Sequence, residues 1–168
     1  MTLFGPEGEL LLWDSIRLET REGNRISNEQ HRQRDSTAMA VAEELARHYG
    51  AETTRSLSSV YNCFGMVFAS RRTAVSPDDI GMILTDDKYT RLVSVEEVMV
   101  GDLVLYTRDD EYSHVAVVVR PQFGQGGMGN RPLVMSQWGA DGEYLHLWDR
   151  VSPWLGEPTE FWTDRYGF

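Results

Sequence analysis

Hydrophobic and polar positions divide the chain into a helical first part and a strand-rich second part. Between Asp35 and Gly50 apolar residues recur at helical spacing, and Gly50 ends the run. A second apolar run follows Asn62 and continues to Arg71 and Arg72. Because this run is apolar nearly all round, we expect a central helix with Asn62 as its N-cap and the two arginines at its negative pole.

Weaker patterns surround these two predicted helices. Residues 3–19 show period-two spacing typical of short strands, whereas residues 51–59 are polar and predict a loop. The sequence Ser-Pro-Asp at 76–78 predicts the start of a short helix. Ser94 followed by Glu97 is typical of a capping box on a single turn.

The second half of the chain is rich in strand patterns separated by turn-forming residues. The four predicted strands are 103–107, 113–120, 132–138 and 143–147. Helices first and strands afterwards predict an α+β fold, with the apolar helix packed on an antiparallel β-sheet. The closing segment 151–162, rich in Trp, Pro and Gly, is expected to wrap the edge of the core.

Length and charge narrow the class of protein. A chain of 168 residues with 41% hydrophobic residues fits one globular domain. Its 26 acidic and 16 basic side chains give a net charge of −10, which disfavours binding to nucleic acid or to anionic membranes. No window approaches the roughly 18 apolar residues of a membrane span, and the start lacks the pattern of a cleaved signal. We therefore expect a cytoplasmic protein, although export without a cleaved signal fits the same sequence.

The single cysteine is either a core residue or a reactive group. One cysteine cannot form an internal disulfide, as expected in a reducing compartment. Cys63 falls in the first turn after Asn62, where a helix N-terminus favours thiolate and can bind an oxyanion. Gly65 would leave room for a substrate backbone, and Tyr61 is a candidate second oxyanion donor beside the Cys63 N–H.

A nucleophilic cysteine needs a general base. Of the four histidines, only His114 begins a run as apolar as residues 115–119. A strand that apolar is expected at the centre of the sheet, with the imidazole at its end, where the N-terminus of the packed helix can meet it. His114 is therefore the predicted base for Cys63.

Three short motifs resemble a known family. NCFG at 62–65, GDLVLY at 101–106 and HVAVVV at 114–119 occur in the order found in papain-like NlpC/P60 and CHAP amidases. The resemblance covers roughly 61–138 and implies a papain-like catalytic core at 60–150 within a single domain of 1–168, whereas 1–50 is an extension that matches nothing in that family. It also implies hydrolysis of amide bonds in peptides, especially cell-wall peptides. Asn62 and Phe64 stand where the family usually has Asp and Ser, which predicts a different substrate groove.

The family also has a polar third residue on the strand after the histidine strand, where it fixes the imidazole tautomer. Antiparallel pairing of the two strands puts His114 opposite about residue 138, which makes Ser136 its polar neighbour on the same face. A slip of one residue at a β-bulge would present Gln137 instead, the better acceptor for an imidazole N–H. If 139–142 is a tight turn, His146 lies opposite about residue 136 and could join the same network.

The expected chemistry is attack of the Cys63 thiolate on an amide or ester carbonyl after His114 removes the thiol proton, with no metal or cofactor. The same site would serve an acyltransferase or a deamidase. A non-catalytic binding or immunity-type module is the alternative from another class. The glycine-rich run 122–130 predicts a hairpin loop rather than a phosphate loop, and the acidic pairs near 86 and 109 predict solvated turns.

Overall fold

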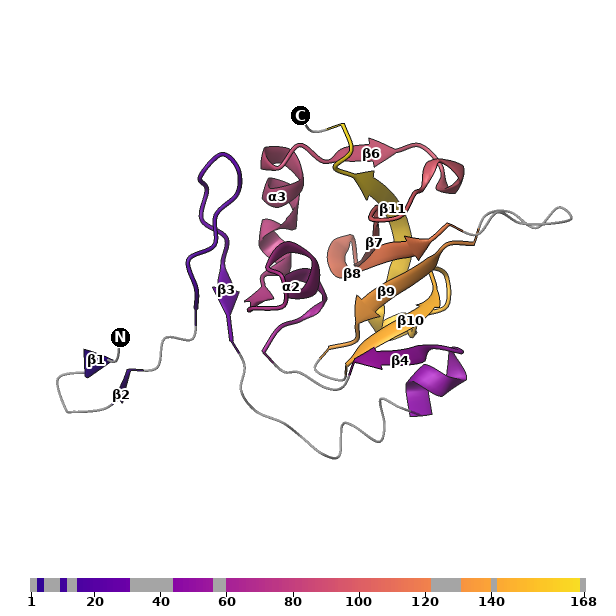
Figure 1. Ribbon diagram of the computed structural model, residues 1–168, viewed down its shortest axis with the longest axis horizontal. Coiled ribbons are helices and arrows are strands. Elements are labelled where there is room, and N and C mark those ends of the chain that lie inside the picture. Colours follow the sequence, from indigo (N-terminus) through magenta and orange to yellow (C-terminus); the bar gives the residue numbers. More distant parts are fainter. Residues whose placement is uncertain are drawn as a thin grey trace, which may run out of the picture.

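A seven-stranded antiparallel sheet forms the centre of the protein. The computed structural model describes residues 3–4, 10–11, 15–30, 44–55, 60–121, 131–139 and 142–166. The strand order is β4-β10-β9-β8-β7-β11-β6 (Figure 1). The strands are β4 (Glu52–Arg55), β6 (Thr90–Leu92), β7 (Leu103–Arg108), β8 (Glu111–Arg120), β9 (Leu133–Gln137), β10 (Glu143–Leu147) and β11 (Glu157–Thr163). The predicted α+β class with an antiparallel sheet is confirmed.

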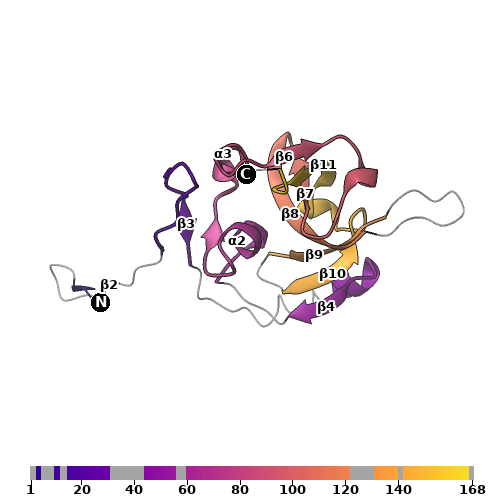
Figure 2. The ribbon, with the colours of Figure 1, turned by 45° about the horizontal axis from the view of Figure 1, so that its top comes forward.

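Two short helices cover one face of this sheet. Helix α2 (Cys63–Phe68) is the predicted central helix, and its residues from Cys63 to Met66 are buried. Helix α3 (Ile80–Asp86) follows the 3-10 turn η1 (Pro77–Asp79), which begins at the predicted position and is capped by Ser76. Figure 2 shows α2 beside the end of β9, with α3 above it.

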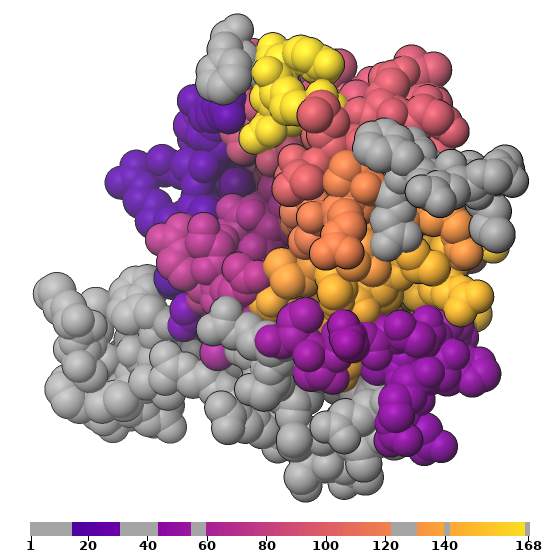
Figure 3. Space-filling view, turned by 45° about the vertical axis from the view of Figure 1, so that its right-hand side comes forward, coloured from indigo at the N-terminus to yellow at the C-terminus, as the bar shows by residue number. Residues whose placement is uncertain are grey.

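The N-terminal part of the chain contributes small elements. Strands β1 (Leu3–Phe4) and β2 (Leu10–Leu11) pair antiparallel, whereas residues 15–18 form no strand. Strand β3 (Asn28–Glu29) pairs with β5 (Ala74–Val75), which leads from α2 towards α3. Of the helix predicted before Gly50, the described part is 44–48, and the rest lies outside the described residues. Figure 3 shows 44–55 along the β10 side of the sheet and 15–30 beside the helices.

Strand alternation separates the core into two layers. Val115 and Leu105 belong to the cluster that contains Cys63, Phe64 and the apolar residues of α3. Tyr106 and Ala116 belong to a second cluster on the opposite face of the sheet. A third cluster around Trp138 and Tyr144 packs against residues 45–51 and Leu155. Each residue of β7 and β8 therefore faces either the helices or the far layer.

Several sequence predictions are wrong in detail. Helix α2 ends at Phe68, because Ser70 and Arg71 adopt left-handed φ angles of 50° and 65°.

The polar segment predicted as a loop contains β4, since a short edge strand needs no apolar pattern. The closing segment is also part of the sheet rather than a wrap, because β11 lies between β7 and β6 and accommodates Pro158 at a register shift. The single turn η2 (Val95–Glu97) forms, but the Ser94 side chain makes no capping hydrogen bond.

No helix among the described residues has the length and apolar character needed to cross a membrane. The predicted hairpin loop at 122–130 lies outside the described residues.

Candidate active site

A hollow of about 320 Å³ lies at the end of the sheet, next to the first turn of α2. We call it the Cys63 hollow. Three parts of the chain form its walls: the start of α2, the β7–β8 hairpin, and the turn η3 (Pro153–Leu155) with the end of β9. Its lining residues are Asn62, Cys63, Phe64, Pro77, Arg108, Glu111, Tyr112, Ser113, His114, Gly139, Trp154 and Leu155.

The capping role of Asn62 is confirmed. Its side-chain oxygen accepts hydrogen bonds from the N–H groups of Gly65 at 2.8 Å and Val75 at 3.1 Å. Its side-chain nitrogen donates to the Val75 carbonyl at 2.9 Å. One side chain therefore caps α2 and ties its first turn to β5, which fixes the position of Cys63.

Gly65 serves packing rather than substrate access. A Cβ atom at Gly65 would lie 1.8 Å from the Thr73 carbonyl oxygen and 3.2 Å from the Ala74 Cα. The backbone before β5 thus occupies the space that a side chain would need. The expectation that this glycine makes room for a substrate is wrong.

The Cys63 thiol is buried and protonated at neutral pH. Burial raises its pKa to about 12, although the backbone N–H groups of Val115, Phe64 and Cys63 itself act in the opposite direction. The N–H groups at the helix N-terminus favour thiolate as expected, but desolvation outweighs them in this arrangement. Those N–H groups nevertheless surround the sulfur and can stabilise negative charge near it.

His114 lies on the opposite face of the sheet from Cys63. It pairs with Tyr106 across β7 and β8, and the two ring centroids are 5.1 Å apart. Val115, the next residue, faces α2 and directs its N–H at the sulfur. The structure therefore brings both predicted residues to the Cys63 hollow, but it does not bring the imidazole to the thiol.

The His114 ring is fully buried and unusually placed. Neither of its ring nitrogens has a hydrogen-bond partner among the described residues. Burial and the neighbouring His146 hold its pKa well below the usual 6.5, so the imidazole is neutral. An unpaired buried polar group costs about 1–3 kcal/mol, so this ring destabilises the present arrangement.

The three candidates for the third position do not hydrogen-bond His114. Ser136 instead lies in a buried chain: Trp138 Nε1 donates to Ser136 Oγ at 3.0 Å, and Ser136 Oγ lies 2.8 Å from His146 Nε2. His146 Nδ1 lies 2.9 Å from the Leu147 carbonyl, which can only accept, so Nδ1 carries the proton and Nε2 accepts from Ser136. The side-chain polar groups of Trp138, Ser136 and His146 therefore all have hydrogen-bond partners.

Gln137 lies on the α2 face, opposite Glu143 in the sheet, and its side-chain nitrogen donates to the Gly139 carbonyl at 2.9 Å. The pairing of β8 with β9 ends at Val117 and Met135. The expected alignment of His114 with residue 138 follows from extending this register, but the two strands no longer pair at that level. The expected position of His146 is wrong by two residues, since it pairs with Val134.

A buried carboxylate that the sequence analysis missed anchors both ends of α2. Glu143 accepts a hydrogen bond from the Tyr61 hydroxyl at 2.7 Å, and Arg71 forms a two-point ion pair with it, including Nη2 to Oε2 at 3.0 Å. Tyr61, the candidate second oxyanion donor, is not among the residues that line the hollow, and its hydroxyl donates to Glu143. The sequence gives little signal for this cluster, because an isolated glutamate in a strand is usually exposed.

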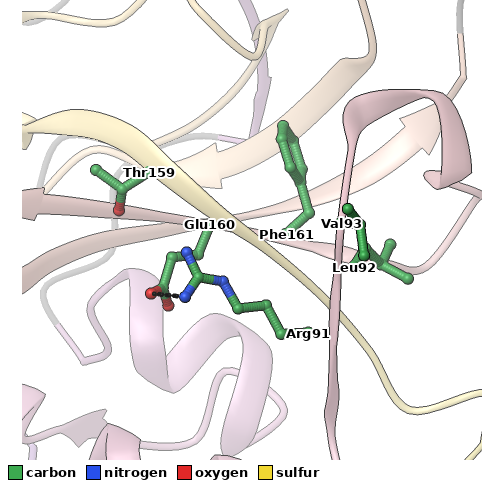
Figure 4. Close-up of a pocket in the computed structure, with 6 residues that line it drawn as sticks. All are labelled: Arg91, Leu92, Val93, Thr159, Glu160 and Phe161. Carbon is green, nitrogen blue, oxygen red and sulfur yellow. Dashed lines mark ion pairs between the residues drawn. The ribbon is translucent and has the colours of Figure 1, made fainter.

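A second hollow lies near the β6 edge of the sheet. Val93 and residues of β6 and β11 line it, among them Arg91 and Glu160, which form an ion pair of 3.3 Å (Figure 4). Glu160 also accepts a hydrogen bond from Tyr112 at 2.9 Å. This carboxylate thus links the β6 edge to a wall of the Cys63 hollow.

The described residues contain no group of three or more His, Cys, Asp or Glu side chains placed to hold a metal ion. Comparison of the chain with models of protein families, with curated proteins and with solved structures finds no match. The resemblance to NlpC/P60 and CHAP amidases therefore depends on the three sequence motifs alone.

Proposed function

We propose that this protein is a thiol hydrolase of the NlpC/P60 and CHAP type, which cleaves amide bonds in peptides with Cys63 as nucleophile and His114 as general base. The observation that carries this proposal is that both residues border one hollow, with the cysteine at a capped helix start. A helix N-terminus beside a nucleophile supplies N–H donors for the oxyanion of a tetrahedral intermediate.

The proposed reaction starts from a neutral thiol and a neutral imidazole. His114 accepts the Cys63 proton as the sulfur attacks the carbonyl carbon, and the N–H groups near the sulfur stabilise the oxyanion. The protonated imidazole then gives its proton to the leaving amine. Water, deprotonated by the same imidazole, releases the acyl group and restores the thiol.

The proposed substrate is a peptide or another amide and not a nucleic acid, because the net charge of −10 repels phosphate. A peptide from the cell wall is the substrate that the family resemblance favours. The single cysteine suits a reducing compartment, so a cytoplasmic location is part of this proposal. Transfer to an acceptor other than water, or deamidation of a glutamine, would use the same site.

The second candidate function is a non-catalytic binding or immunity-type module. The observation that favours it is the position of the His114 ring on the face away from Cys63, together with a thiol whose pKa is raised to about 12. Such a module would keep the hollow as a binding site and need no proton transfer.

Acylation by p-nitrophenyl esters separates the two candidates without knowledge of the natural substrate. A thiol hydrolase should release a burst of one p-nitrophenolate per chain. It should also carry a thioester on Cys63, the only cysteine, which intact-mass spectrometry detects. Cys63→Ala should abolish the burst, and His114→Ala should slow it by about 100-fold or more. An absent burst in a protein with an ordinary cooperative melting curve would favour the binding module.

A further inference from the structure

We propose that a β-bulge in β8 is a switch: moving it by one residue carries the His114 side chain from the far face of the sheet to the face of Cys63. The inference rests on the proposed function, because it supplies the arrangement in which the imidazole reaches the thiol. It assigns the present structure to the resting state.

The register of β7 and β8 defines where the bulge lies now. Leu105 pairs with Val115 and Tyr106 with His114, but the next residue, Thr107, pairs with Tyr112. Ser113 is therefore the extra residue, and it lies with His114 opposite Tyr106. Both members of a bulge direct their side chains to about the same face, which here is the Tyr106 face.

A shift of the bulge by one residue changes the face of His114 alone. If Ser113 pairs with Tyr106, the extra residue becomes His114, which then lies with Val115 opposite Leu105. Leu105, Val115 and Cys63 share one buried cluster, so the imidazole would enter the Cys63 face. The pairs on either side keep their partners, so the rest of β8 does not slip.

The other edge of β8 allows this movement. Pairing with β9 ends at Val117, so no ladder hydrogen bond to β9 is recorded at His114. The movement breaks no hydrogen bond of the imidazole, because its two nitrogens have no partner among the described residues. On the Cys63 face it would gain the thiol as a partner.

Ser113 holds the resting arrangement through the turn η3. Its hydroxyl lies 2.7 Å from the Leu155 carbonyl and 3.3 Å from the Tyr106 carbonyl. A Cβ atom on Gly156 would lie 2.3 Å from this hydroxyl, so the approach of η3 to the bulge depends on that glycine. Ser113 and Leu155 both line the Cys63 hollow, and a substrate in the hollow therefore contacts the bond that holds the bulge.

Deletion of Ser113 tests the switch directly. The shortened strand retains the pairs Tyr106–His114 and Thr107–Tyr112 but has no extra residue to move, which fixes His114 on the far face. We expect a folded protein, by circular dichroism and melting, whose burst rate with p-nitrophenyl acetate equals that of His114→Ala. A burst as fast as the wild type in this deletion, with a slow one in His114→Ala, would overturn the switch and leave the proposed function standing.

Two substitutions decide the question if the deletion does not fold. Ser113→Ala removes the bond to Leu155 and should raise the burst rate about fivefold, the factor of one ordinary hydrogen bond. Thr85→Ala is the control, since its hydroxyl donates to the Gly81 carbonyl within α3 at 2.9 Å and touches neither β7 nor β8, and its rate should stay at the wild-type value. An unchanged or lower rate in Ser113→Ala overturns the switch. Equal rates in wild type and His114→Ala would refute the proposed function and the switch with it.

Discussion

The backbone of Thr73 fills the space beside Gly65: a Cβ atom on this glycine would lie 1.8 Å from the Thr73 carbonyl oxygen. The Thr73 oxygen is a backbone atom, so a side-chain rotation cannot relieve the contact. Helix α2 and the segment before β5 are therefore held at a distance that only glycine allows. The position of Cys63, two residues earlier, depends on this packing.

Gly65→Ala should lower the free energy of unfolding by about 2 kcal/mol or more, because α2 must move away from β5. Gly81→Ala in α3 is the control, since a Cβ there meets no atom within 4 Å, and it should be neutral or stabilise by up to about 1 kcal/mol. Urea unfolding of both variants measures the difference. Equal stabilities would show that α2 and the backbone of Thr73 can move apart without cost.

Glu143→Ala should destabilise the protein by about 3 kcal/mol. The substitution removes an almost fully buried carboxylate and leaves Tyr61 and Arg71 without their acceptor. The control is Glu22→Ala at the Lys88–Glu22 pair, whose side chains are 57% and 55% exposed and whose loss should change stability by less than about 0.5 kcal/mol. A change as small as the control in Glu143→Ala would contradict the anchoring role.

Ser136→Ala should destabilise by about 1–3 kcal/mol without slowing the acylation of Cys63. The variant leaves His146 Nε2 and Trp138 Nε1 without their partner, whereas His114 makes no hydrogen bond to Ser136. Urea unfolding and the p-nitrophenyl acetate burst test the two parts. A burst slowed about 100-fold, as in His114→Ala, would make Ser136 the residue that orients the base.

The stability of the protein should fall as the pH drops below about 6.5. Burial lowers the pKa of His146 from 6.5 to about 4, so between these values the unfolded chain binds a proton that the folded protein does not. The stabilisation is complete above about pH 6.5 and is lost towards about pH 4, on the order of 3 kcal/mol for this residue. The pKa of His114 is also lowered, so this residue likewise makes the protein less stable as the pH falls.

Urea unfolding at several pH values between about 7.5 and 4.5 measures this loss. His146→Gln should show a shallower decrease, because only the contribution of His114 remains in this range. A decrease as steep as in the wild type would show that His146 does not cause it.

Much of the fold could be predicted from the sequence because its signals are local. Alternation gave β10 with its observed ends, and Asn62 marked the first residue of α2. Strand β4 and the inner position of β11 were missed, since an edge strand has no apolar pattern and Pro158 is atypical of a strand inside a sheet. The end of α2 was missed because the backbone turns left-handed at Ser70 and Arg71, and the Arg71 side chain pairs with Glu143, a contact distant in sequence.

The sequence could place Cys63 and His114 at one end of the sheet, but it could not predict the face on which the imidazole lies. Period-two alternation gives the face of a residue only while the strand pairs regularly, and the extra residue Ser113 interrupts that pairing. The third position was missed for a related reason, because β8 and β9 stop pairing at Val117 before they reach it. The face of His114 and the residue at the third position both depend on how distant strands pair, which residue types alone do not determine.

The rate of iodoacetamide alkylation at Cys63 as a function of pH tests most directly whether His114 and Cys63 act as a pair. Cys63 is the only cysteine, so the signal has one source. We predict that wild type, in which the proposed bulge shift brings the imidazole to the thiol, reacts about tenfold or more faster at neutral pH than His114→Ala. The variant keeps only the buried thiol of the present arrangement, whose pKa is raised to about 12. Identical profiles for the two proteins would show that His114 never activates Cys63, and would contradict the proposed hydrolase.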